Sequence, residues 1–247
     1  MDLGKLTMIG YAGEALASPL SHPAFDRALD AAGLRAGDVV LDLGCGPGQA
    51  AAHMARRGAQ VIGVERHALV AEAARERGRD AAPGSVDVRV GEASAMDDLP
   101  AADIVVAMGA GKLAGAQADA AEILRWLARR AKPGGALLWG ETYWTREPSP
   151  VMARVAETAG GFDTNEGHRA AGAEAGLSLL HVEQSSRAER DDYTREYANR
   201  IVSYLDAHPD DPDAEAMANR ARSWRALYEY EAGDATGFAL YVWRTPA

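Results

Sequence analysis

Two acidic residues and a run of glycines carry the clearest chemical signal in this chain. Asp42 lies within the apolar segment Val39–Leu43, and Gly44, Gly46 and Gly48 follow directly. Because glycines lack a Cβ atom, they permit positive φ and let the backbone approach a ligand closely. A carboxylate at Asp42 would repel a pyrophosphate but suits the cationic end of an amino-acid tail, directly or through water. The segment therefore predicts a crevice for a nucleotide-like ligand that carries such a tail.

The second acid, Glu65, ends the apolar segment Gln60–Glu65. In nucleotide-binding folds, an acid about twenty residues beyond the glycine loop binds the ribose hydroxyls. A carboxylate suits this task because it can accept from both hydroxyls in charge-assisted hydrogen bonds. The alternative for Glu65 is a solvated acid near a helix N-terminus, where the helix dipole stabilises it.

A parallel sheet is needed to position these groups. Val39–Leu43 is the near-continuous apolar run of a strand covered on both faces, and Gln49–Arg57 follows as a helix that Gly58 ends. We expect further strands at Gln60–Glu65, Val86–Val90, Asp103–Met108, Ala136–Gly140, Ser178–Gln184 and Gly237–Arg244. We expect a loop at Met8–Gly13 and further helices at Pro19–Ala32, Gln117–Ala131, Pro150–Ala159, Asn165–Ala175, Asp191–Ala207 and Asp213–Ala232.

The glycine segment resembles motif I of the class I S-adenosylmethionine-dependent methyltransferases. Glu65, the pair Glu92–Ala93 after the third strand, and Lys132-Pro-Gly-Gly135 before the fifth strand fit the same family in order. The resemblance spans Val39–Gly140. It implies an α/β, Rossmann-like, doubly wound fold whose seven-stranded, mostly parallel sheet has the order 3-2-1-4-5-7-6, with the last strand antiparallel.

The resemblance also implies S-adenosyl-L-methionine as the cofactor. In this family the acid matching Glu65 holds the ribose, and the acid–alanine pair binds the adenine. The implied cofactor site consists of Asp42, Gly44, Cys45, Gly46, Glu65, Arg66, Glu92, Ala93, Met108 and Gly109. Cys45 is expected to be a small apolar residue of the loop and not a nucleophile. We expect a single methyltransferase domain over 1–247, with an N-terminal cap at 1–35, a cofactor-binding core at 36–140 and a helical insertion at 190–233.

The segment after the fifth strand is the best candidate for acceptor recognition. Gly140-Glu-Thr-Tyr-Trp144 resembles a motif of a bacterial, small-molecule-type subgroup of these methyltransferases. Glu141, Tyr143 and His168 are candidate catalytic residues by location alone. The substrate-pocket candidates are Tyr11, Trp144 and Tyr193. Alternatively, Trp144 is a core residue and Glu141 caps a turn, and the helical insertion is either a lid or a dimer surface.

Composition and residue spacing disfavour several classes of partner and cofactor. A net charge of -10 and a pI of about 5.1 disfavour electrostatic capture of nucleic acid. The single cysteine excludes an intramolecular disulfide and fits a reducing compartment. The histidines show no metal-ligand spacing, and no apolar stretch is long enough to cross a bilayer. We expect a metal-independent, cytoplasmic monomer or homodimer with neither a nucleic-acid nor a membrane partner.

The predicted reaction is direct in-line methyl transfer to a small-molecule acceptor. Most of the rate can come from holding the nucleophile and the methyl group in a reactive geometry. A general base is needed only if the nucleophile arrives protonated. Two alternatives remain: a non-catalytic S-adenosylmethionine-binding subunit, and a nicotinamide-dependent oxidoreductase, for which Glu65 would also serve.

Overall fold

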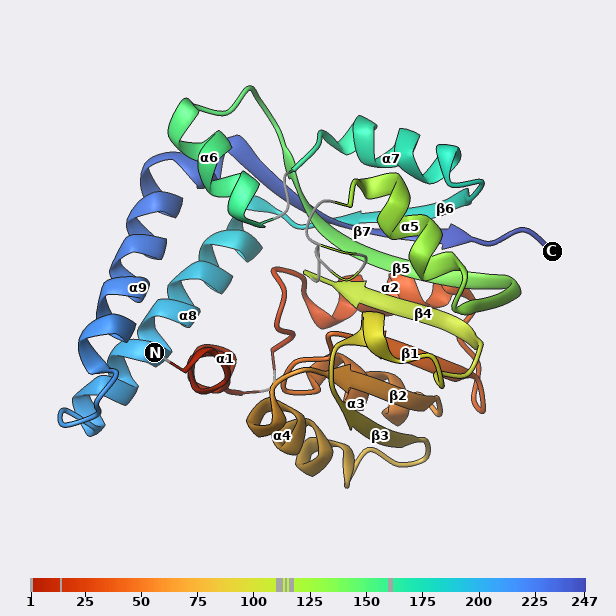
Figure 1. Ribbon diagram of the computed structural model, residues 1–247, viewed down its shortest axis with the longest axis horizontal. Helices are drawn as coiled ribbons and strands as arrows, with labels where there is room; N and C mark the ends of the chain where they lie inside the picture. Colours follow the sequence, from red (N-terminus) through yellow and green to blue (C-terminus); the bar gives the residue numbers. More distant parts are fainter. Residues whose placement is uncertain (1, 14, 110–112, 114, 116–117, 160–161) are drawn as a thin grey trace.

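A computed structural model describes residues 2–13, 15–109, 113, 115, 118–159 and 162–247. Within these residues, seven strands form one sheet in the order β3-β2-β1-β4-β5-β7-β6 (Figure 1). The strands are β1 (Val39–Leu43), β2 (Gln60–Glu65), β3 (Ser85–Val90), β4 (Ala102–Met108), β5 (Ala131–Trp144), β6 (Ser178–Gln184) and β7 (Thr236–Arg244). The strands from β1 to β5 pair in parallel, whereas β7 pairs antiparallel with both β5 and β6. The predicted order and the antiparallel last strand are confirmed.

Helices cover both faces of this sheet because alternate strand residues point to opposite sides. On one face, Val40, Leu138 and Val242 form a core with Phe25 of α2 (His22–Ala32) and Met54 of α3 (Gln49–Arg56). On the other face, a second core joins Leu137, Trp139 and Tyr241 to α5 (Ala120–Ala128) and α7 (Asn165–Glu174). The helix α4 (Ala68–Gly78) packs beside α3 and against β3.

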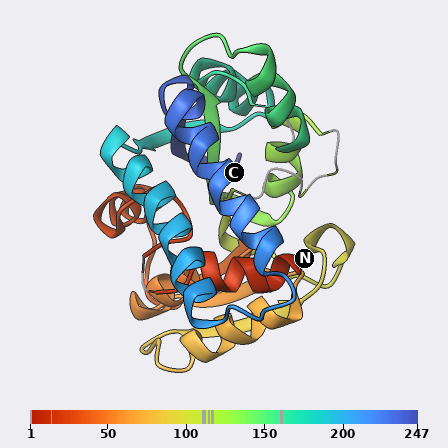
Figure 2. The same ribbon diagram turned by 90° about the vertical axis from the view of Figure 1, so that its left-hand side faces the viewer.

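A helical cap lies beyond the ends of the parallel strands. It contains α1 (Leu3–Gly10), α8 (Arg187–Ala207) and α9 (Ala214–Leu227). Figure 2 shows α8 and α9 beside one another, with α1 crossing near their ends. Leu6, Ile201 and Met217 form the buried apolar cluster that joins the three helices. The helix α6 (Pro150–Ala159) follows β5, and the π-helical turn Tyr228–Ala232 and α10 (Gly233–Ala235) connect α9 to β7.

The N-terminal loop expected at Met8–Gly13 is partly wrong, because Met8–Gly10 belong to α1. The Asp2 side chain caps this helix by accepting hydrogen bonds from the N–H groups of Gly4 and Lys5. The helix forms because its apolar side packs on α8 and α9, which lie far away in the sequence. The local sequence therefore contained the N-cap residue Asp2, but not the surface of α8 and α9 that stabilises the helix.

Two boundaries around β5 also differ from expectation. The helix expected at Gln117–Ala131 ends at Ala128, because Ala131 already pairs with Ala102 in β4; Gln117 lies outside the described residues. The strand does not end at Gly140 but runs on to Trp144, since β7 supplies pairing partners along this extension. The motif expected in a connection is therefore part of the sheet.

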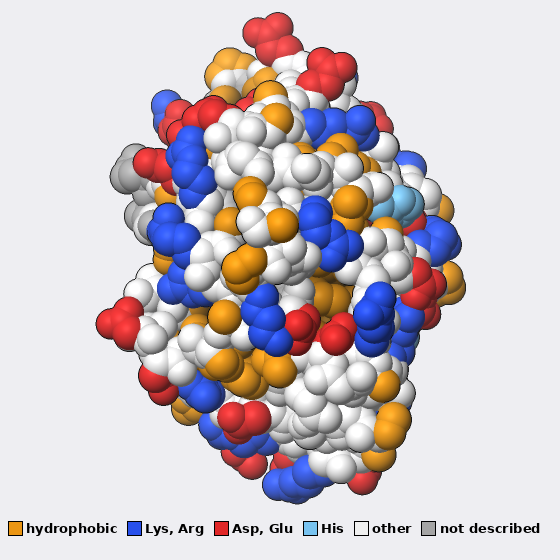
Figure 3. All heavy atoms as spheres, turned by 90° about the vertical axis from the view of Figure 1, so that its right-hand side faces the viewer, with side chains coloured by type: hydrophobic (Ala, Val, Ile, Leu, Met, Phe, Trp, Pro, Cys, Tyr) orange, Lys and Arg blue, Asp and Glu red, His pale blue; other side chains and the backbone are white. Residues whose placement is uncertain are grey.

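The two ends of the molecule differ in surface character. The end near the C-terminus, away from the cap, intermixes acidic, basic and apolar side chains (Figure 3). Positive and negative groups on that face compensate each other locally. Among the described residues, no helix combines the length and the apolarity that a membrane span requires.

Candidate active site

The glycine loop between β1 and α3 is held by hydrogen bonds to the neighbouring strand. The N–H groups of Gly44 and Cys45 both donate to the carbonyl oxygen of Val64 in β2, at 2.9 and 3.1 Å. Gly44 and Gly46 have φ angles of 78° and 54°, in the left-handed region that favours glycine. A Cβ atom added at Gly46 would meet nothing within 4 Å. The loop is thus held to β2 by hydrogen bonds, and the open space beside Gly46 leaves room for a ligand.

Gly48 serves a different purpose. Its φ angle is 85°, and an added Cβ atom would lie only 2.8 Å from Cα of Ala74 in α4. The missing side chain lets α3 start close to α4. Cys45 lies nearby and is buried, with its Sγ against Gly63. Burial raises the pKa of its thiol, which matches the expected apolar role.

Two buried carboxylates face the crevice beside this loop. Asp42 is only 3% exposed, and its Oδ2 has no hydrogen-bond partner within the described part of the chain. Burial, and then the nearby charge of Glu65, raise the pKa of Asp42 to about 7. Glu65 is 9% exposed, and its Oε1 accepts a hydrogen bond from the N–H of His67 at 2.8 Å. A cationic ligand group would relieve the repulsion between these acids and satisfy the free oxygen.

The remaining predicted cofactor residues lie at or just after the ends of neighbouring strands. Nη1 of Arg66 lies 3.9 Å from Oε1 of Glu92, and both side chains are exposed. Ala93 is buried at the start of a short 3₁₀ turn, Ala93–Ala95. Met108 is half-buried at the end of β4, and Gly109 follows with a φ angle of 64° and open space where a Cβ would lie. These residues stand at successive strand ends, as the resemblance implies; their contacts with the cofactor stay predictions.

The three predicted catalytic side chains belong to β5 and α7. One oxygen of Glu141 accepts from the N–H of Thr142 at 2.8 Å, and burial raises the pKa of Glu141 to about 7. The hydroxyl of Tyr143, which is buried, donates to Oε1 of Gln184 at 2.8 Å. Both side chains lie on the α5 and α7 side of the sheet, by the alternation of β5.

His168 lies deep in the core on that same side. Its ring is T-shaped to Trp139, with centroids 4.8 Å apart, and its Nδ1 lies 3.3 Å from the hydroxyl of Tyr241. Burial lowers the pKa of His168 to about 4, so the ring is neutral near pH 7. The structure therefore surrounds His168 and Tyr143 with core partners, and none of the three predicted catalytic residues is in the lining of the cavity described next.

A cavity of about 250 Å³ lies beside Gly109, beneath α8 and α9. Tyr11 and Tyr193, both predicted for the substrate pocket, line it. Their hydroxyls are 3.0 Å apart and their rings are stacked, with centroids 6.0 Å apart. The other lining residues are Ala17, Ser18, Pro19, Thr142, Met152, Val155, Phe162, Arg190, Thr194, Trp224, Leu227, Tyr228, Ala232, Thr236, Gly237 and Phe238. We call this cavity the acceptor pocket.

Trp144, the third predicted pocket residue, is not in the lining of the acceptor pocket. Its ring makes a T-shaped contact with Phe162, with centroids 5.2 Å apart, and Phe162 does line the pocket. Trp144 therefore supports the wall from behind. Sequence reasoning missed Ser18 and Arg190, because neither belongs to a motif and they come together only through folding.

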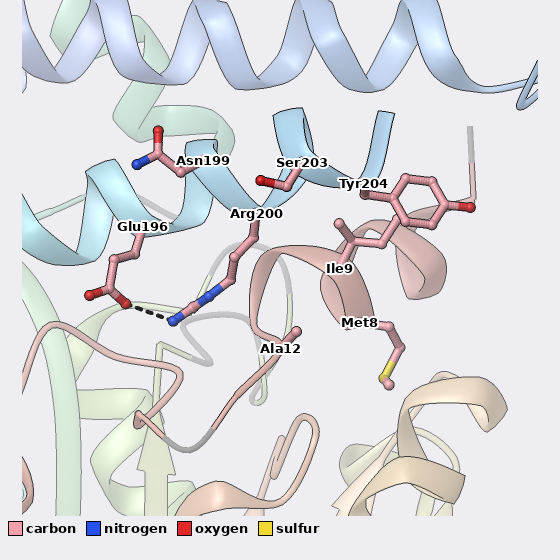
Figure 4. Close-up of a pocket in the computed structure, with 8 residues that line it drawn as sticks. All are labelled: Met8, Ile9, Ala12, Glu196, Asn199, Arg200, Ser203 and Tyr204. Atoms are coloured by element: carbon pink, nitrogen blue, oxygen red, sulfur yellow. Dashed lines mark hydrogen bonds and ion pairs between the residues drawn. The ribbon is translucent and has the colours of Figure 1, made fainter. Parts of the chain in front are cut away.

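A wider hollow of about 630 Å³ lies between α1 and α8 (Figure 4). Met8 and Ile9 come from α1, and Glu196 and Arg200 form an ion pair of 2.6 Å on α8. None of its described lining residues comes from the carboxyl ends of the strands, where the acids and glycines lie. In open α/β sheets, ligands bind at those ends. We therefore place the chemistry at the acceptor pocket and not at this larger groove.

Known proteins resemble this chain in sequence, over part of it or over most of it. Residues 40–135 match the family described as a methyltransferase domain. Over 68 residues the chain is 50% identical to the protein-L-isoaspartate O-methyltransferase of Methylorubrum extorquens (strain PA1). This matched segment covers 27% of this chain and 29% of that protein. The chain spans less than half the length of the curated isoaspartate methyltransferases that it matches. It is also 25% identical over 221 residues to "Uncharacterized protein YjhP" of Escherichia coli (strain K12), covering 85% of this chain and 86% of that protein.

The fold resembles that of a solved S-adenosylmethionine-dependent methyltransferase from Geobacter sulfurreducens in complex with S-adenosyl-L-homocysteine. The TM-score is 0.86, with 98% of each chain covered and 23% sequence identity. Residues 40–135 therefore match a methyltransferase domain, and the whole chain has the fold of a solved S-adenosylmethionine-dependent methyltransferase. The recognition based on the glycine loop is confirmed, and S-adenosylmethionine is the cofactor of such methyltransferases.

Proposed function

We propose that this protein transfers a methyl group from S-adenosylmethionine to a small-molecule acceptor. One observation carries the proposal: the buried Asp42, whose Oδ2 has no partner in the described part of the chain, and the open glycine loop lie at the same end of the sheet as a pocket that reaches Gly109. Asp42 and the glycine loop fit a cationic, nucleoside-bearing cofactor. The pocket offers space for a second ligand beside that cofactor.

The residues of the crevice fit this cofactor chemically. Asp42 would bind the ammonium of the methionine tail, which is the group that an unpartnered buried carboxylate stabilises best. Glu65 would bind the ribose hydroxyls, with its other oxygen already fixed by the N–H of His67. Gly44 and Gly46 would let the backbone approach the tail. Glu92 and Ala93 would bind the adenine, and Cys45, Arg66, Met108 and Gly109 would line its surroundings.

The acceptor pocket fits a small molecule because α8 and α9 enclose it. When bound, S-adenosylmethionine would supply an activated sulfonium methyl group for in-line transfer to the acceptor. The protein's part is to hold the acceptor in place and exclude water, which the aromatic walls of the pocket do. Tyr11 and Tyr193 would close the pocket on its N-terminal side.

Of the three predicted catalytic residues, we keep Glu141 as the candidate general base. It follows Gly140, which pairs with Met108 at the end of β4. Glu141 is not in the lining of the acceptor pocket, so it would act on the acceptor from the cofactor side of the strand end. A pKa of about 7 also suits proton transfer near neutral pH. A lower kcat for Glu141→Gln at unchanged cofactor affinity would support this role, and unchanged kcat would exclude it.

The test is transfer of label from methyl-labelled S-adenosylmethionine into a cell extract split by size into metabolites and macromolecules. We expect label in the metabolite fraction with the wild-type protein and at least tenfold less with Asp42→Ala at a subsaturating concentration of S-adenosylmethionine. Label in the protein fraction alone would replace the small-molecule acceptor with a protein one. Binding of S-adenosylhomocysteine with no transfer would favour a non-catalytic subunit, and binding of NADH instead would favour an oxidoreductase.

A further inference from the structure

The acceptor pocket has one charged group among its described lining residues, the guanidinium of Arg190. Its Nη1 donates to the carbonyl oxygen of Ser185 at 2.7 Å. Its Nε is buried and has no partner among the residues that the structure describes. The neighbouring acid Asp191 attracts Arg190 through space, but its hydrogen bonds go elsewhere: it is paired with Arg187 at 2.6 Å and accepts from Tyr228 at 2.8 Å.

A second donor without a partner lines the same pocket. Ser18 is 6% exposed, and its Oγ has no hydrogen-bond partner within the described part of the chain. Leaving a buried polar group unsatisfied costs about 1–3 kcal/mol. Ser18 comes from the N-terminal segment, whereas Arg190 comes from α8. Both residues line one cavity, and each has a buried donor atom without a partner in the described part of the chain; an acceptor-rich, negatively charged group placed between them would satisfy both.

We propose that the methyl acceptor is a small aromatic or otherwise apolar molecule with one carboxylate, and that Arg190 and Ser18 bind this carboxylate. The inference rests on the proposed function, since it names the acceptor class of the same pocket. A guanidinium matches a planar carboxylate through charge-assisted hydrogen bonds. One positive charge in an apolar pocket balances one negative charge; a phosphate dianion would leave a surplus charge buried, which is costly.

The apolar lining of the pocket indicates what the uncharged part of the acceptor is. Phe162, Tyr193, Trp224 and Phe238 present aromatic walls, and Met152 and Leu227 add apolar ones. Such surfaces favour a flat or branched hydrocarbon body. Because the pocket also includes Gly109 at the end of β4, a carboxylate held by α8 leaves the opposite part of the acceptor to meet the methyl group.

The first experiment compares matched acids and amides. Benzoate, phenylacetate and 3-phenylpropanoate would each be titrated by calorimetry beside the corresponding carboxamide, with and without saturating S-adenosylhomocysteine. We expect at least one acid to bind ten times more tightly than its amide, which is about 1.4 kcal/mol. If no acid binds more tightly than its amide, the inference is wrong.

Variants then test whether Arg190 and Ser18 cause the preference for the acid over its amide. Arg190→Met should reduce the affinity for the preferred acid about tenfold while leaving the amide and S-adenosylhomocysteine unaffected. Ser18→Ala should cause a smaller loss in the same direction. Arg195→Met is the matched control, because Arg195 is also on α8 but is exposed and paired with Asp192 outside the pocket. A preference that survives in Arg190→Met would overturn the assignment.

The titration with S-adenosylhomocysteine alone separates this inference from the proposed function. If that titration shows no binding, the proposed function fails, whatever the acids do. If the cofactor product binds but acid and amide bind equally, only the acceptor class fails. The wild-type comparison of acid with amide needs no variant, so a poorly folding Arg190→Met protein cannot leave the question open.

Discussion

The glycine-loop crevice and the acceptor pocket lie next to one another at one end of the sheet, yet their charges are opposite. The crevice buries two acids, Asp42 and Glu65, whereas the pocket has a single cation, Arg190, among its described lining residues. Each site holds a buried polar atom that the described protein does not satisfy, Asp42 Oδ2 in one and Arg190 Nε in the other. Under the proposed function, charge as well as shape assigns each ligand to its own site, because a buried charge is costly unless it is paired.

The two sites also differ in construction. The crevice is made from the ends of β1 and β2 and the turns that follow them, so each residue is placed by its own strand. The pocket joins α8 and α9 to Ser18, Thr142 and Phe238, which come from three distant parts of the chain. The crevice is consequently anchored by the sheet, whereas the pocket depends on how the cap packs onto it.

The largest effect should come from removing the acids of the crevice. Asp42→Ala and Glu65→Ala should each weaken binding of S-adenosylhomocysteine tenfold or more, because losing a charge-assisted hydrogen bond costs about 1.5–3 kcal/mol. Calorimetric titration measures this loss. The acid preference of the acceptor pocket should persist in both variants. Wild-type affinity in either variant would remove that residue from the cofactor site.

A pH series should give an effect of about tenfold. Burial and the charge of Glu65 raise the pKa of Asp42 to about 7, so its carboxyl is mostly protonated at pH 6 and mostly ionised at pH 8. Since the ionised form binds an ammonium group, affinity for S-adenosylhomocysteine should rise about tenfold from pH 6 to pH 8. Asp42→Asn should bind weakly and with little dependence on pH. A flat wild-type profile would contradict this role of Asp42.

A smaller effect is expected on the stability of the free protein. The ordinary pKa of an aspartic acid side chain is 3.8, whereas the pKa of Asp42 in the folded protein is about 7. As pH rises from 4 to 7, the Asp42 carboxyl therefore ionises in the unfolded state while it stays mostly protonated in the folded state. The folded state therefore loses stability over this range. Asp42→Asn should therefore raise the Tm of the ligand-free protein above that of the wild type at pH 8 and should give no such gain at pH 4.5. Equal shifts of Tm at both pH values would argue against a buried, titrating carboxyl.

The smallest effect should come from the opposite side of the sheet. Tyr143→Phe removes the hydrogen bond to Gln184 and should lower the free energy of unfolding by about 1 kcal/mol. Affinity for S-adenosylhomocysteine and the acid preference should not change. Denaturant unfolding and the two titrations measure these quantities. A loss of kcat without a loss of stability would instead restore the catalytic role predicted for Tyr143.

Much of the cofactor crevice could be predicted from the sequence, because its parts are local. Asp42 precedes Gly44 and Gly46 within one short segment, and Glu65 ends the next strand. Strand ends in a parallel sheet meet at one edge, so finding the strands was enough to bring the acids together. The acceptor side was predicted less well. Tyr11 and Tyr193 do line the pocket, whereas Trp144 packs behind its wall.

Pairing between distant strands explains that difference. The motif Gly140–Trp144 looked like a connection, but β7 pairs with it and extends β5. Alternation along the extended strand then turns Thr142 toward the pocket and Tyr143 toward the core of the other face. Composition and spacing do not reveal this alternation until it is known that the segment is a strand.

The sequence by itself indicated the strands, the glycine turns and the carboxylates at strand ends, which are short-range patterns. Through those patterns it resembled a known family, and that resemblance implied the order of the sheet. Only the tertiary structure decided the acceptor pocket. Ser18 and Arg190 share no motif and no neighbouring element, and they come together because α8 packs across the ends of the strands beside the N-terminal segment. Their chemistry follows from burial, which a sequence does not state and packing creates.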